Sequence, residues 1–145
     1  MTEVTFHFNA PDKVGHACRL LRKAVATGAR VVVTGEERLL RELDTALWTF
    51  SPLEFVAHCM EPGSAAPVLA ASPVVLAASP GKAPHQQVLV NLGAGVPEGF
   101  ERFERLIEVV TTGDDDRQQG RQRWKHYADR GYAIAKHDLA AREAQ

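Results

Sequence analysis

The sequence has little cysteine, almost no net charge and no long apolar run that is free of proline. Its two cysteines, Cys18 and Cys59, are too few for a disulfide framework or a four-ligand zinc site. The longest uncharged stretch, residues 62–81, contains four prolines, which argues against a membrane span. Charged residues near the start, such as Glu3 and Asp12, argue against a signal peptide. We therefore expect a cytoplasmic protein that does not associate with membranes.

The charge balance argues against non-specific binding of DNA, although it leaves open a local basic patch. The 145 residues include 17 basic and 18 acidic side chains, for a net charge of −1. Proteins that bind DNA directly and tightly are usually clearly basic, because they neutralise phosphates. The length suits one domain, which at this size needs neither disulfides nor metal for stability.

Signatures of catalysis and of cofactor binding are also missing. Residues 9–13, which follow the first predicted strand, contain no glycine, whereas a dinucleotide-binding turn needs several. Gly93, Ala94 and Gly95 lack the third glycine and fit a tight turn. The six histidines show no metal-ligand spacing, and no serine lies in a nucleophile elbow. Residues 114–116 are three aspartates, which favour a helix N-terminus over a metal site. We expect no catalytic residue, no metal and no cofactor.

Hydrophobic periodicity predicts alternating strands and helices, which is typical of an α/β domain with a mostly parallel sheet flanked by helices. The predicted strands are 4–8, 30–34, 74–76, 87–92 and 107–110, and the predicted helices are 13–26, 36–47, 97–106 and 114–130. Residues 62–84 carry five prolines and one charge, so we expect loops around the strand at 74–76. The domain is predicted to span residues 1–139, and residues 140–145 to form a frayed tail.

The last predicted helix concentrates positive charge. From Arg117 to Arg130 there are five basic residues and one acid, which give this segment a net charge of +4. Arg117, Arg121 and Trp124 have the i, i+4, i+7 spacing that places them on one helix face. Two guanidinium groups beside a flat aromatic ring suit a peptide with carboxylates and an aromatic side chain. The alternative is a solvated basic face with Trp124 in the core.

A second aromatic group follows the second predicted helix. Trp48 and Phe55 flank a bend that contains Pro52. These two side chains could line a pocket, or they could cover the end of the sheet.

Three segments carry a more specific pattern. The first is Leu43-Asp44-Thr45-Ala46-Leu47-Trp48, followed by Phe55 and His58. The second is residues 88–92 followed by Pro97 and Phe100, and the third is residues 121–127 followed by Gly131 and Tyr132. Together these segments resemble the chi subunit family of bacterial DNA polymerase III, and the resemblance runs from the first strand to about Leu139. The first and third segments, in this order and at this separation, are specific together.

The resemblance implies a Rossmann-like fold without nucleotide binding and a non-catalytic accessory subunit of the clamp-loader complex. It also implies two partners, the psi subunit and the acidic C-terminal tail of the single-stranded-DNA-binding protein, which ends in proline and phenylalanine. By motif position, the tail-binding residues would be Trp48, Phe55, Val110, Arg117, Arg121 and Trp124. Two alternatives stay open, a small α/β protein that binds a nucleotide, and direct binding of single-stranded DNA by Trp124, Tyr127 and the arginines.

Overall fold

A computed structural model describes residues 2–49, 58–61, 73–78, 80, 83 and 85–140. In chain order the elements are β1 (Glu3–Ala10), α1 (Lys13–Ala26), β2 (Val31–Thr34), α2 (Glu37–Thr49), β3 (His58–Glu61), β4 (Val74–Ala77), β5 (Val88–Asn91), the 3-10 turn η2 (Phe100–Arg102), β6 (Arg105–Thr111), α4 (Asp114–Asp129) and β7 (Ile134–Asp138).

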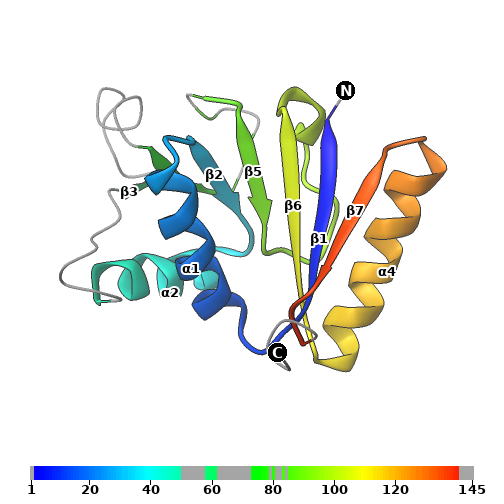
Figure 1. The fold of residues 1–145 in the computed structure, drawn as a ribbon. Coiled ribbons are helices and arrows are strands. Elements are labelled where there is room, and N and C mark those ends of the chain that lie inside the picture. Colours follow the sequence, from blue (N-terminus) through cyan, green and yellow to red (C-terminus); the bar gives the residue numbers. More distant parts are fainter. Residues whose placement is uncertain are drawn as a thin grey trace.

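The strands form one sheet in the order β3-β4-β2-β5-β6-β1-β7, and every pair in it is parallel (Figure 1). The first strand therefore lies between two strands from the last third of the chain. This arrangement confirms the predicted α/β class and is consistent with a Rossmann-like fold.

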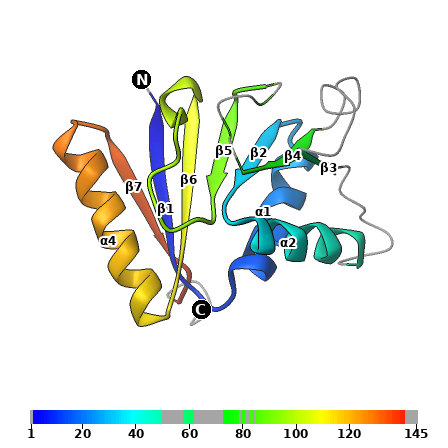
Figure 2. The ribbon, with the colours of Figure 1, turned by 180° about the vertical axis from the view of Figure 1, so that it is seen from behind.

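The helices cover the two faces of the sheet unequally, as Figures 1 and 2 show from opposite sides. Helices α1 and α2 pack on one face, where Leu21 and Leu43 join alternate strand residues such as Val31 and Val33 in one core cluster. Helix α4 packs on the other face, where Tyr127 joins a cluster containing Val32. Successive strand residues point to opposite faces, so each strand contributes to both clusters.

Local signals explain where the helices begin and end. Asp12 caps α1, because its carboxylate accepts a hydrogen bond of 2.8 Å from the backbone N–H of Gly15. Helix α4 ends just before Gly131, whose φ of 80° lies in the left-handed region that favours glycine. Both helix predictions are confirmed, as is the predicted strand at 107–110, which lies within β6.

The predicted helix over 97–106 is wrong. The chain forms only the short turn η2 there, preceded by Gly99 with a φ of 81°, and β6 has already begun at Arg105. Phe100, Phe103 and Leu106 are all buried in the cluster on the α4 face of the sheet. Their helical spacing therefore reflects burial by a turn and the strand that follows it, and not a helix.

Two strands, β3 and β7, were not predicted from the sequence. Strand β7 pairs with β1 over Ile134–Asp138, directly before the expected tail. Most of residues 62–84 and all of 141–145 lie outside the described residues, so the expectations for these loops and the tail stay predictions. Within the part of the chain that is described, no helix combines the length and apolarity that a membrane crossing requires.

Candidate peptide-binding groove

A groove of about 330 Å³ lies between α4 and the sheet, close to the edge formed by β7. Four of the residues predicted from the sequence line it together, namely Val110 from β6 and Arg117, Arg121 and Trp124 from α4. Arg117, Arg121 and Trp124 therefore share one surface of α4, as their spacing predicted. Their grouping brings two cations and an aromatic ring next to an apolar strand.

The floor of the groove is apolar and aromatic. Phe6 and Phe8 of β1 line it with Val110, and the Phe6 ring centroid lies 5.0 Å from that of Trp124. Trp124 is half-buried, so its ring both packs against the sheet and forms part of the groove wall. An aromatic floor of this kind suits an apolar side chain of a ligand.

Gly120 lets α4 approach the sheet at the groove. A Cβ atom at this position would lie 2.9 Å from Cγ2 of Val110, which is closer than two carbon atoms normally approach. The missing side chain therefore allows the helix to pack directly on β6 and keeps the groove open between Arg117 and Trp124.

The acids near the groove do not line it. Asp116 bonds Lys13 Nζ at 2.8 Å and accepts hydrogen bonds from the Thr111 backbone N–H, at 2.7 Å, and the Thr111 hydroxyl. Burial alone would raise the pKa of Asp116, but these donors outweigh burial and hold the pKa below its ordinary value. None of the described residues that line the groove is acidic, whereas Arg117 and Arg121 are exposed. The groove is therefore electropositive.

Below the groove, α4 is fixed to the sheet by a buried polar network. Glu108 of β6 is fully buried and accepts hydrogen bonds from Arg123 Nε at 2.9 Å, the Tyr127 hydroxyl at 2.5 Å and Asn91 Nδ2. Arg123 is 2% exposed and also donates from Nη1 to the Ala94 carbonyl at 2.8 Å. Arg123 therefore contributes to a buried ion pair and not to the cationic surface.

Burial shifts the titration of this network. It raises the pKa of Glu108, against the opposing effect of the Arg123 guanidinium and the hydrogen-bond donors. Burial and the neighbouring carboxylate together raise the pKa of Tyr127, so its hydroxyl remains a donor over the whole physiological range.

Trp48 does not join the groove. It lies near the end of α2, its side chain is 60% exposed, and α2 packs on the other face of the sheet, against β3 and β4. The structure therefore separates Trp48 from Arg117, Arg121 and Trp124. Phe55, the sixth predicted residue, lies outside the described residues.

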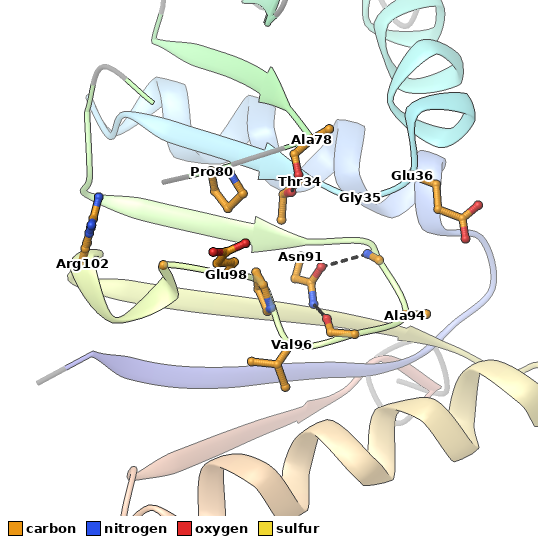
Figure 3. Close-up of a pocket in the computed structure, with 14 residues that line it drawn as sticks. Thr34, Gly35, Glu36, Ala78, Pro80, Asn91, Ala94, Val96, Glu98 and Arg102 are labelled. Carbon is orange, nitrogen blue, oxygen red and sulfur yellow. Dashed lines mark hydrogen bonds between the residues drawn. The ribbon is translucent and has the colours of Figure 1, made fainter. Parts of the chain in front are cut away.

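A second pocket, of about 620 Å³, lies at the carboxyl ends of β2 and β5, where α/β folds commonly bind ligands (Figure 3). Asn91 shapes its floor, because its amide accepts a hydrogen bond from Gly93 N–H and donates one to the Gly95 carbonyl. Glu36 and Glu98 line this pocket together with Arg102, so its charged lining is more acidic than basic, which does not favour a nucleotide phosphate. Within the described ranges, no three potential ligand side chains are grouped to hold a metal ion.

Comparison with known proteins identifies the family of the chain. The family model described as "DNA polymerase III chi subunit, HolC" matches residues 1–135. The chain belongs to this family. A "DNA polymerase III subunit chi" of Pseudomonas aeruginosa is 32% identical over 144 residues, which cover 96% of this chain and 98% of that protein. A protein of the same name from Haemophilus influenzae is 26% identical over 121 residues, 82% of each chain. Membership of the chi family associates the chain with the DNA polymerase III complex and with DNA replication.

The sequence pattern did not identify several residues of the groove and its support. Phe6 and Phe8 alternate in the first strand, a signal that they share a face, but the pattern does not say which face α4 covers. Glu108 is a lone acid between apolar residues in a predicted strand, a signal for a buried carboxylate that needs a partner. Lys136 lines the groove from β7, which was not predicted.

Proposed function

We propose that this chi-family chain is a non-catalytic adaptor of the DNA polymerase III holoenzyme. In this proposal its groove binds the acidic C-terminal tail of the single-stranded-DNA-binding protein, and the psi subunit links it to the clamp loader. The observation that carries the proposal is the groove itself, in which two exposed arginines adjoin an aromatic floor and the described lining residues include no acid.

The groove offers a complementary contact for each part of such a tail. The terminal phenyl ring would pack against Phe6, Val110 and Trp124. The terminal carboxylate and the aspartates would pair with Arg117 and Arg121, whose guanidinium groups give directed, charge-assisted hydrogen bonds. A micromolar peptide site corresponds to about 8 kcal/mol of binding free energy, and salt should weaken it because part of this energy is screened charge attraction.

The proposed tail site differs from the sequence-based one by the removal of one residue and the addition of two. Trp48 is left out because it lies on the opposite face, and Phe55 stays a prediction. Phe6 and Phe8 are added because they form the floor. The psi contact is proposed from family membership alone and has no residues assigned to it.

A peptide titration tests the proposal. A fluorescently labelled acidic tail peptide is titrated with the full-length protein at low salt, and binding is followed by anisotropy. Arg121→Ala should weaken binding about tenfold or more, because it removes charge-assisted hydrogen bonds. Arg38→Ala is the matched control, since Arg38 is an exposed arginine on α2 outside the groove, and it should leave affinity unchanged.

Two results would contradict the proposal. The first is the absence of peptide binding by the wild-type protein at low salt. The second is tight binding of a single-stranded oligonucleotide with a steep salt dependence, without the tail peptide, which would favour direct DNA binding.

A further inference from the structure

Lys136 lines the groove from a different element than the two arginines. It lies on β7, where its Cα pairs with that of Phe6, the aromatic residue of the floor. Ile134, two residues earlier in the same strand, packs in the core cluster on the α4 face. Because side chains alternate along a strand, Lys136 lies on this same face. The groove is thus bordered by Arg117 and Arg121 from α4 and by Lys136 from the edge strand.

Trp124 forms a link between the two sides of the groove. The Lys136 ammonium lies 6.0 Å from the Trp124 ring centroid, at the outer limit of a cation–π contact. Phe6 packs against the same ring. The aromatic wall therefore orients the lysine over the groove, while the exposed ammonium stays accessible to a ligand.

We propose that Lys136 is the third cation of the groove and makes it selective for peptides with carboxylates at two separated positions around the apolar anchor. This inference rests on the proposed tail binding. Cations on two different elements, with an apolar floor between them and no acid in the lining, fit such a peptide better than one with a single terminal carboxylate.

Lys136 should contribute less to the affinity for the peptide than either arginine of the groove. An ammonium is a strongly hydrated point charge on a flexible stem, whereas a guanidinium donates in a fixed fork. Exposed ion pairs are typically weak, so loss of the Lys136 charge should reduce affinity about two- to fivefold.

A double-mutant cycle between protein and peptide tests the inference. The full-length protein is compared with Lys136→Gln, Lys136→Arg and the control Lys23→Gln, an exposed lysine of α1 outside the groove. Three labelled peptides are used, an acidic tail peptide, the same peptide with its internal aspartates replaced by asparagine, and the same peptide with a C-terminal amide. Lys136→Gln should reduce the affinity for the acidic peptide two- to fivefold. Lys136→Arg should keep this affinity within about twofold of wild type, and Lys23→Gln should leave it unchanged.

The peptide series separates charge pairing from a general effect on the fold. The effect of Lys136→Gln should disappear with one of the two charge-deleted peptides and persist with the other, which identifies the carboxylate that pairs with Lys136. Equal weakening of all three peptides, or no weakening of any, would overturn the inference. If the wild-type protein binds none of the peptides, the proposed function itself fails. If Arg121→Ala weakens binding and Lys136→Gln does not, only the inference fails.

Discussion

The two faces of the sheet are covered by helices of opposite character. On one face, α2 buries the apolar stripe Leu40, Leu43 and Leu47. On the other face, the buried residues of α4 are Gly120, Arg123 and Tyr127. The first helix is held by apolar burial, and the second by close backbone approach together with a buried ion pair and its hydrogen bonds.

This difference shows how a helix can be both part of a fold and part of a binding surface. Burial of a leucine stripe removes apolar area from water and leaves a mostly polar outer side of α2, on which Trp48 is exposed. Attachment through Arg123 and Tyr127 lets the neighbouring residues of α4, Arg121 and Trp124, stay at the groove. The four predictions below test this comparison, from the largest expected effect to the smallest.

Removal of the buried carboxylate should have the largest effect. Glu108→Ala would leave the Arg123 guanidinium buried without its acidic partner and take an acceptor from Tyr127. Breaking a buried pair in this way typically costs about 3–5 kcal/mol of unfolding free energy, measured by urea denaturation. Glu37→Ala, in the exposed Arg41 pair of α2, is the control and should cost less than about 1 kcal/mol. A loss below about 1 kcal/mol for Glu108→Ala would show that the network does not hold α4.

Truncation in the leucine stripe should lower stability without affecting the groove. Leu43 is fully buried, so Leu43→Ala should cost about 2–5 kcal/mol of unfolding free energy through lost burial and a cavity. The affinity of the folded variant for the tail peptide should stay within about twofold of wild type. A loss of affinity like that of Arg121→Ala would mean that the two faces are not independent.

The pair of Asp116 and Lys13 should make stability depend on pH in the acid range. Because the folded-state pKa of Asp116 lies below its ordinary value of 3.8, this carboxylate stabilises the fold above that pH. The contribution is lost as the pH falls through the folded-state pKa. Asp116→Asn should be less stable than wild type by about 1 kcal/mol at pH 7. Denaturation curves at decreasing pH should show this difference closing below about pH 4, and a difference that is constant with pH would refute the assignment.

Removal of the Trp48 side chain should have the smallest effect on binding of the tail peptide. Trp48 lies on the α2 side of the sheet, so Trp48→Ala should change the tail-peptide dissociation constant by less than about twofold in the anisotropy titration. Trp124→Ala is the matched comparison, and it should weaken binding because it removes the groove wall. Tenfold weakening by Trp48→Ala would mean that the tail extends beyond the groove.

Local patterns in the sequence predicted most of the fold. The apolar runs of β2, β4 and β5 and the periodic leucines of α2 each determine their element without distant partners. The helix predicted over residues 97–106 failed because Phe100, Phe103 and Leu106 match helical spacing by coincidence, and Gly99 interrupts it. Strand β7 was missed because its exposed residues have little strand character of their own, so its pairing with β1 stabilises it.

The candidate site was predictable only where it depends on local sequence patterns. Arg117, Arg121 and Trp124 share a face because helical spacing is local, and their grouping could be derived from the sequence. The separation of Trp48 from them depends on which face of the sheet each helix covers, which local patterns do not encode. Glu108 and Arg123 were identifiable only as a charge in an apolar strand and a charge in a basic helix, and their pairing depends on the packing of α4 against β6.

The position of β1 in the sheet determines when the groove can form during synthesis of the chain. This strand is made among the first residues, yet its neighbours β6 and β7 come about 100 and about 130 residues later. Until they emerge from the ribosome, Phe6 and Phe8 have no strand beside them and α4 does not yet cover them. Such long-range pairing is slow to form and exposes apolar surface in the meantime. The groove is therefore among the last parts of the molecule to exist, and a nascent chain lacking β7 could not yet recruit a partner through it.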